Sequence, residues 1–230
     1  MANLECPFDR KQILGYRRRV LRFGRTHARS FPWRYSTDPY AVLVGEILLQ
    51  RTSGSHVSQV FERFVNRWPT PHDLGIADEE ELACVLRPLG LAKRMPLLLE
   101  MGRAVDSLGE VPLSPEALNK LPGVGRYTAH AVPIFTANRD LPLADWVIAR
   151  ILRRYFGLAG TGRPNADEKL WALATEIARV GRAREVWIGT LDLAAKFCRS
   201  KPRCAACPLE GTCCYARTSP ASTPGSARTA

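Results

Sequence analysis

The sequence has no apolar run of the roughly 20 residues that a membrane-spanning helix needs. Residues Met1 to Gly15 carry scattered charges and lack the apolar core of a signal peptide, so we expect a cytoplasmic protein with no membrane partner. Alternating runs of β-branched residues are also scarce, which argues against a sheet. Most segments repeat their apolar residues at helical spacing, and we therefore predict an all-α fold.

Acidic residues are the scarcer charge, with 22 Asp and Glu against 33 Lys and Arg and a formal net charge of +11. An excess of this size favours a polyanionic partner, most often nucleic acid. An anionic membrane surface is the weaker alternative, because no basic amphipathic stretch ends in a lipid-facing aromatic belt. The 230 residues are enough for one large domain or two small ones.

The predicted helices are joined by short connections rich in Pro and Gly. A strongly basic amphipathic helix is expected near residues 10–25, and Asp38 is the expected cap of a helix with Pro39 in its first turn. From residue 217 onward small and polar residues dominate, so we expect the tail 217–230 to be disordered. Further helices are predicted over Val57–Arg67, Glu79–Arg87, Pro96–Leu108, Pro115–Lys120, Tyr127–Ala137, Trp146–Phe156, Asp167–Val180 and Arg184–Lys196.

A short glycine-containing hairpin separates two of these helices. Gly123, Val124 and Gly125 follow Leu121-Pro122, and Arg126 opens the next helix. Glycine permits a tight turn and lets backbone N–H groups approach an anion, and the following helix adds the positive end of its dipole. The functional interpretation is a clamp on one DNA phosphate, and the alternative is an ordinary turn between helices.

Two carboxylates stand alone in apolar surroundings. Asp145 is the only charge between Leu141 and Ala149, and Glu46 is the only charge between Pro39 and Leu49. Desolvation raises the pKa of such groups, which makes them candidates for catalysis. A helix N-cap role for Asp145, and an ion pair with an arginine for Glu46, are the structural alternatives. Hydrolysis of a glycosidic bond uses one carboxylate to stabilise the sugar cation and to assist water.

Five of the seven cysteines lie within 17 residues near the C-terminus. In a reducing compartment this clustering indicates a metal site and not a disulphide framework. The spacing of Cys198, Cys204, Cys207 and Cys213 suits a [4Fe–4S] cluster or a zinc ion, and Cys214 is an alternative fourth ligand.

The motifs stand in a specific order along the chain. They are Phe31-Pro32-Trp33-Arg34, Asp38-Pro39-Tyr40, Glu46 to Thr52, the hairpin, Asp145 with Arg150, and the cysteine loop. In this order they resemble the endonuclease III superfamily of DNA glycosylases across roughly residues 10 to 216. The resemblance implies a two-domain helix-hairpin-helix fold with a C-terminal [4Fe–4S] loop. It places a six-helix barrel at residues 29–139 and a second domain at residues 1–28 plus 140–216.

The residue after Arg126 indicates the branch of this superfamily. Glycosylases of this type that also cleave the strand carry a lysine there, which forms a Schiff base, whereas this chain has Tyr127. The resemblance therefore implies a monofunctional enzyme, closest to the small glycosylases that remove thymine or uracil opposite guanine. An adenine glycosylase acting opposite guanine or 8-oxoguanine is the first alternative. A non-catalytic DNA-binding iron–sulphur protein is the second.

The resemblance also assigns roles within the site. Asp145 drives hydrolysis, and Tyr127 and Glu46 line the pocket for the flipped base. Leu91 enters the duplex as a wedge, and Gln50 fills the gap that the base leaves. The expected partner is mismatched double-stranded DNA, bound by a monomer associated with the nucleoid.

Two positions depart from the pattern of the superfamily. Phe197 occupies the usual place of the first cysteine, so that Cys198 comes one residue late and the first cysteine interval is shorter. Val147 replaces an amide or histidine two residues after Asp145, which removes a polar contact at that position.

Overall fold

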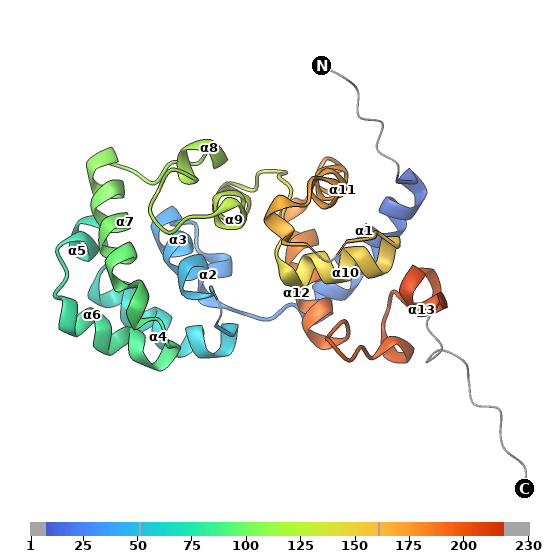
Figure 1. Ribbon diagram of the computed structural model, residues 1–230, viewed down its shortest axis with the longest axis horizontal. Coiled ribbons are helices and arrows are strands. Elements are labelled where there is room, and N and C mark those ends of the chain that lie inside the picture. The colour runs from blue at the N-terminus through green and yellow to red at the C-terminus, as the bar shows by residue number, and fades with distance from the viewer. Residues whose placement is uncertain (1–7, 51, 161, 219–230) are drawn as a thin grey trace, which may run out of the picture. The chain divides into compact units, whose positions relative to one another are not determined.

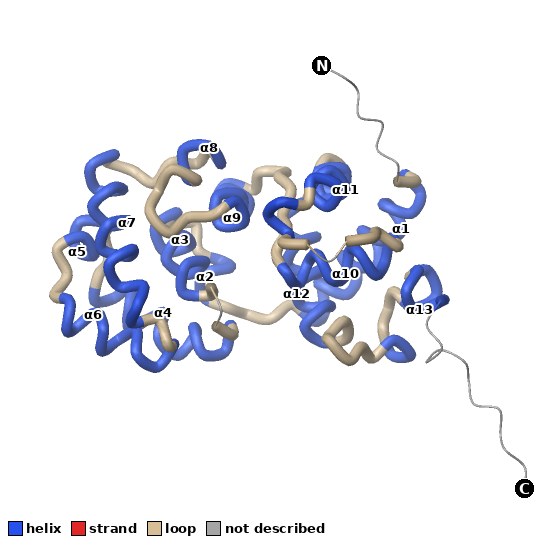
Figure 2. The backbone as a smooth tube through the Cα atoms, viewed as in Figure 1, coloured by secondary structure: helices blue, strands red, loops and turns tan. Residues whose placement is uncertain are grey.

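The computed structural model describes residues 8–50, 52–160 and 162–218, and every regular element in these ranges is a helix. Figure 2 shows helices joined by loops, with no strand in the described part of the chain. The prediction of an all-α fold is therefore confirmed. No described helix is both long and apolar enough to cross a membrane.

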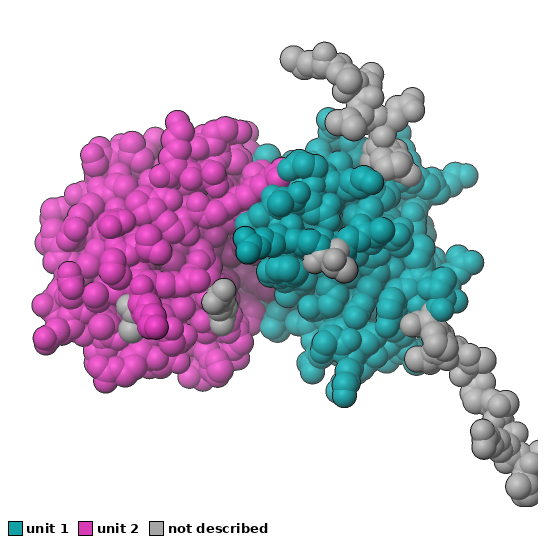
Figure 3. Space-filling model, viewed as in Figure 1, with its two compact units in different colours: residues 1–29, 140–230 teal, residues 30–139 magenta. Residues whose placement is uncertain are grey.

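The chain divides into two compact units, which Figure 3 colours separately. We call residues 30–139 the hairpin unit, and residues 1–29 together with 140–230 the cysteine unit. The first and last described segments of the chain, residues 8–29 and 162–218, thus belong to the same unit. Each unit has its own buried apolar core.

The hairpin unit is built around a helix that is buried along almost its whole length. Helix α3 (Pro39–Leu48) packs against α9 (Arg126–Ala137), and α5 (Pro71–Gly75) packs against α7 (Met95–Leu108) (Figure 1). The remaining elements are α2 (Pro32–Tyr35), α4 (Gly54–Arg67), α6 (Glu79–Leu86), α8 (Pro115–Leu118) and the 3-10 turns η1 (Arg87–Leu89) and η2 (Ala92–Arg94).

The cysteine unit is formed by helices from both ends of the sequence. Helix α1 (Arg10–His27) packs closely against α12 (Ala183–Lys196). A Cβ atom at Gly189 would lie 2.7 Å from the carbonyl oxygen of Val20, so this close approach requires glycine. The remaining elements are α10 (Trp146–Phe156), α11 (Glu168–Ala178), α13 (Cys214–Thr218) and the turns η3 (Pro164–Ala166), η4 (Cys204–Ala206) and η5 (Glu210–Thr212).

One arginine of the basic N-terminal helix is buried. Arg17 is 4% exposed and donates hydrogen bonds to the carbonyl oxygens of Ile177 and Gly181, at the end of α11 and in the following turn. The hydroxyl of the adjacent Tyr16 lies 2.9 Å from the hydroxyl of Thr190 on α12. These contacts fix α1 against two helices that are distant in sequence.

The helix starts follow the capping signals of the sequence. The carboxylate of Asp38 accepts a hydrogen bond from the N–H of Tyr40 at 2.9 Å, which confirms the predicted cap of α3. The helices predicted from apolar spacing are all present, with ends shifted by a few residues. Arg217 and Thr218, at the start of the expected tail, lie in α13, and residues 219–230 are outside the described residues.

Candidate active site and cysteine loop

The glycine hairpin lies between α8 and α9 and leaves the start of α9 open. Gly123 has φ of +74°, a left-handed conformation that favours glycine. Gly125 is the N-cap of α9 and no side chain caps this helix. A Cβ at Gly125 would meet no other atom within 4 Å, so there is space in front of the helix. The turn therefore has the form of an anion site, with the positive end of the α9 dipole facing open space.

A side chain from the end of α3 holds the hairpin. The amide nitrogen of Gln50 donates to the carbonyl oxygen of Gly123 at 3.1 Å, and its amide oxygen accepts a hydrogen bond from Arg94. The structure thus brings Gln50 and the hairpin together, although the sequence assigned them to different DNA contacts, the gap left by the flipped base and a phosphate. Arg94 was not predicted, because nothing in the sequence distinguishes it from the other arginines.

The two expected base-pocket residues lie on helices that pack together. Glu46 is 3% exposed within α3, and Tyr127 is half-buried in the first turn of α9. Val124, at the tip of the hairpin, is itself only 7% exposed. The packed helices α3 and α9 therefore carry Glu46 and Tyr127, and Gln50, just after α3, is hydrogen-bonded to the hairpin that precedes α9.

Leu91 lies in the turn between η1 and η2, and its side chain is only 5% exposed. Its N–H donates to the carbonyl oxygen of Leu86 at 3.3 Å. The expected wedge is thus buried in the hairpin unit and is not displayed on its surface. Leu91 would have to leave this position to enter a duplex.

Asp145 caps α10. Its Oδ1 accepts a hydrogen bond from the N–H of Ile148 at 2.7 Å. Burial raises the pKa of this carboxyl group above its ordinary value, while the N–H groups of Ile148 and Val147 and the charge of Arg150 oppose the rise. The N-cap alternative is therefore correct as a description of the structure. The same contact holds the carboxylate in one orientation, which is compatible with catalysis.

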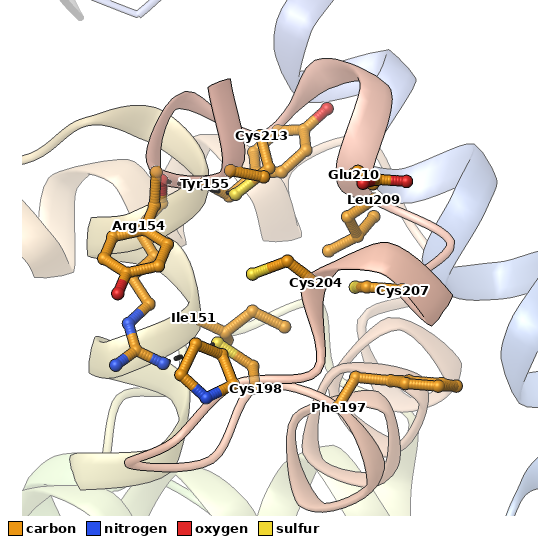
Figure 4. Close-up of a pocket in the computed structure, with 13 residues that line it drawn as sticks. Ile151, Arg154, Tyr155, Phe197, Cys198, Cys204, Cys207, Leu209, Glu210 and Cys213 are labelled. Carbon is orange, nitrogen blue, oxygen red and sulfur yellow. Dashed lines mark hydrogen bonds between the residues drawn. The ribbon is translucent and has the colours of Figure 1, made fainter. Parts of the chain in front are cut away.

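Helix α10 also holds the cysteine loop. The Nε of Arg150 donates to the carbonyl oxygen of Cys198 at 2.7 Å. One turn later, Arg154 donates to the carbonyl oxygens of Arg199 at 2.6 Å and Ser200 at 3.3 Å. Arg154 also lies 3.4 Å from the sulphur of Cys198, as the dashed line in Figure 4 marks. One helix therefore joins Asp145 at its start to the cysteine loop along its length.

Four cysteines line one pocket of the cysteine unit, together with Arg154 and a mainly apolar wall (Figure 4). The pocket contains about 370 Å³ of space, part of it open to solvent. Its cysteines are Cys198, Cys204, Cys207 and Cys213.

The adjacent Cys214 does not line this pocket. Its side chain lies near Gly157 at the end of α10, and its sulphur is 4.0 Å from the side-chain nitrogen of Gln12. Of the two candidates for a fourth ligand, the structure therefore favours Cys213. Phe197 also lines the pocket, directly before Cys198.

The donor set of the pocket fits a metal group that binds thiolates. Burial raises the pKa of the Cys207 thiol to about 11, and burial also raises the pKa values of Cys204 and Cys213. A positive group is needed to hold such thiols as thiolates. Among the described residues, no three His, Cys, Asp or Glu side chains are grouped closely enough to hold a single ion.

Comparison with known proteins gives a consistent result. Residues 44–176 match the family model described as "HhH-GPD superfamily base excision DNA repair protein". The chain is 37% identical to the thymine-DNA glycosylase of Aeropyrum pernix, and the match covers 90% of this chain and 96% of that protein. It is 34% identical to the thymine/uracil-DNA glycosylase of Methanothermobacter thermautotrophicus, over 85% of this chain and 90% of that protein.

The solved structure of a thermostable thymine-DNA glycosylase superposes on this chain with a TM-score of 0.83 at 33% identity. The superposition covers 90% of this chain and 97% of the solved structure. The adenine DNA glycosylase of Mycobacterium tuberculosis is 32% identical, but the match covers only 63% of that protein.

Proposed function

Because this chain belongs to the HhH-GPD superfamily of base excision DNA repair proteins, we propose that it is a monofunctional DNA glycosylase. It flips out thymine or uracil mispaired with guanine and removes the base by hydrolysis. The observation that carries this proposal is the match to thymine and thymine/uracil glycosylases over nearly the full length of both partners.

Asp145 is the proposed catalytic carboxylate. Cleavage of an N-glycosidic bond develops positive charge on the sugar, and a fixed carboxylate stabilises that charge and helps water to attack. The bond to Ile148 N–H fixes the side chain before substrate binds, and burial keeps water from screening its charge. Both features support this role.

Tyr127 and Glu46 are proposed to contact the extruded base. A phenol and a carboxyl group offer hydrogen bonds to the polar edge of a pyrimidine. Tyr127 lacks the amine that forms a Schiff base, so the product is an abasic site in an intact strand. Gln50 and the hairpin residues Gly123, Val124, Gly125 and Arg126 are proposed to contact the DNA beside this nucleotide.

We assign the cysteine pocket to a [4Fe–4S] cluster held by Cys198, Cys204, Cys207 and Cys213. Such a cluster, when bound, would cross-link the four thiolates and so stabilise the loop. The four thiols surround one pocket, and thiolates are ligands both of [4Fe–4S] clusters and of structural zinc. Zinc held by the same four cysteines is the alternative, and the iron content and visible absorbance of the purified protein distinguish the two.

The proposed function is tested with duplexes that carry T·G, U·G, A·G or A·8-oxoguanine pairs. After incubation, alkali converts abasic sites to strand breaks, and a parallel sample without alkali reports any lyase activity. We expect breaks at T·G and U·G only, and only after alkali. Cleavage confined to the adenine pairs would assign the chain to the adenine branch.

The non-catalytic alternative requires a separate control. The Asp145→Asn chain is compared with the unaltered chain for both base release and DNA binding. An unaltered chain that binds all four duplexes and releases no base from any of them would show a DNA-binding protein and would refute the glycosylase proposal.

A further inference from the structure

The net positive charge of the protein lies entirely in the cysteine unit. That unit contains 22 Lys and Arg against 10 Asp and Glu, a net charge of +12. The hairpin unit contains 11 basic and 12 acidic residues, a net charge of −1, which together give the +11 of the chain. A polyanion is therefore attracted mainly to the unit that carries Asp145.

One large aromatic side chain is exposed in this unit, directly beside Asp145. Trp146 is the first residue of α10 and is 61% exposed. The other four tryptophans of the sequence are at most 2% exposed (Trp33, Trp68, Trp171 and Trp187). Burial of an indole side chain is favourable, and folding leaves this one exposed. Contact with a partner would therefore bury it and contribute to the free energy of binding.

The position of Trp146 at the helix start gives its side chain a direction. The Cα–Cβ bonds of a helix tilt toward its N-terminus, so the first residue projects past the helix end. That end is where the carboxylate of Asp145 is held by the N–H of Ile148. The indole is thus directed to the same side of the helix as the proposed catalytic group.

A path of positive charge leads away from Trp146 along the same helix face. Arg150 lies four residues later, and neighbours at this spacing share a face. Its Nε is bonded to the carbonyl oxygen of Cys198, where the cysteine loop begins. The loop then exposes three cations, Arg199, Lys201 and Arg203. An exposed aromatic side chain followed by a row of cations is the arrangement that binds a single nucleic-acid strand. The bases stack on the aromatic ring, and the cations bind the phosphates.

We infer that Trp146 is a DNA-contacting residue that stacks on a base of the strand next to the extruded nucleotide. This inference rests on the proposed function, because it places the DNA by the position of Asp145. When the target nucleotide is flipped out, the adjacent base loses its stacking partner, and Trp146 stacks on that adjacent base. This role is distinct from cleavage of the glycosidic bond.

The contact can be observed directly, since Trp146 is the one tryptophan that solvent reaches. Acrylamide quenching of tryptophan fluorescence is measured for the Asp145→Asn chain, which leaves the duplex intact, without DNA and with a short T·G duplex. We expect strong quenching of the free protein and protection when DNA is bound. Quenching that DNA leaves unchanged would overturn the inference, as would an indole already shielded in the free protein.

Three variants separate stacking from simple apolar contact. Trp146→Phe keeps an aromatic face, Trp146→Leu keeps apolar bulk, and Trp146→Ala removes both. We expect near-normal affinity for Phe, and affinity lower by about 5- to 150-fold for Ala, with Leu close to Ala. Val180→Ala, which removes another exposed apolar side chain of the same unit, is the matched control and should bind normally. Leu binding as tightly as Trp would overturn the stacking contact.

The two proposals fail separately in these experiments. If the unaltered chain releases base from T·G but bound DNA does not protect Trp146 from acrylamide, the stacking contact is refuted. The glycosylase proposal is then unaffected. Protection of Trp146 by DNA, together with an unaltered chain that releases no base from any duplex, would refute the glycosylase proposal and support the stacking contact. In steady-state kinetics, loss of stacking is expected to raise KM more than it lowers kcat.

Discussion

Replacement of Asp145 separates its two roles, because the cap and the charge depend on different properties of the side chain. In the unaltered chain the N–H of Ile148 donates to Oδ1 of Asp145 at 2.7 Å. Asparagine keeps an oxygen at Oδ1 that accepts this hydrogen bond, but it carries no charge. Alanine removes both. The loss of an N-cap costs about 1 kcal/mol, which for a chain of this length lowers Tm by about 2–4 °C.

We therefore expect the two variants to differ in stability and to agree in activity. Asp145→Asn should melt at the temperature of the unaltered chain or higher, and Asp145→Ala should melt about 2–4 °C below Asp145→Asn, because both variants lose the charge and only alanine loses the cap. Both should lose at least about 100-fold in the single-turnover rate of base release from T·G. The measurements are thermal unfolding by circular dichroism and rapid-quench kinetics.

The raised pKa of Asp145 gives this prediction a pH dependence with a definite sign. The carboxyl group titrates above its ordinary 3.8 in the folded chain, so the folded state holds the proton more tightly than the unfolded state. The contribution of Asp145 to stability is thus most favourable below 3.8 and is lost as pH rises through the folded pKa. Relative to the unaltered chain, Asp145→Asn should therefore have a higher free energy of unfolding at neutral pH, and this difference should disappear in acid.

Activity should follow the opposite course, because catalysis needs the ionised form. Base release should decline as pH falls through a value above 3.8, and this acid limb should be absent from the residual activity of Asp145→Asn. An Asp145→Asn chain that releases thymine at the normal rate would refute the catalytic assignment. An Asp145→Ala chain as stable as Asp145→Asn would refute the capping argument.

The remaining predictions concern the hairpin and the cysteine loop. Gly125→Ala should fold with a stability change within about 0.5 kcal/mol, because its Cβ meets no protein atom, yet it should bind duplex DNA more weakly in fluorescence anisotropy. Gly123→Ala should instead lose about 1 kcal/mol in chemical unfolding, because its φ is +74°. Cys207→Ser should lower iron content and visible absorbance, while Cys214→Ser, outside the pocket, should leave both unchanged. Arg154→Ala removes the bonds to the loop carbonyls and should accelerate loss of iron to a chelator, and an unchanged rate would contradict the role of this residue.

Helix α10 illustrates what local sequence signals predict well. A capping aspartate, apolar residues at helical spacing and a glycine after Phe156 give the same bounds, Trp146–Phe156, as the structure. Helices α2, α5 and α13 were missed, because helices of four and five residues are too short for apolar spacing to be seen. Such short helices depend on tertiary packing.

The site was predicted less completely than the fold, for a different physical reason. Cys213 and Cys214 are chemically identical neighbours, and only the turn of the chain at η5 and α13 directs one into the pocket and the other toward Gly157. Leu91 is apolar in either a surface or a core position, and its burial depends on how the turn after α6 packs. Arg154 resembles the other arginines until the fold places it against the loop.

The uneven charge of the two units separates two kinds of DNA contact. The hairpin unit has a net charge of −1 and exerts little long-range attraction, so its hairpin holds a phosphate through groups that act at short distance, namely the backbone N–H groups, the dipole of α9 and the side chain of Arg126. The cysteine unit has a net charge of +12 and attracts the duplex over a distance of about 8–10 Å, set by the screening length of salt. The cysteine unit therefore governs encounter with DNA and its salt dependence, whereas the hairpin governs where the bound strand is fixed.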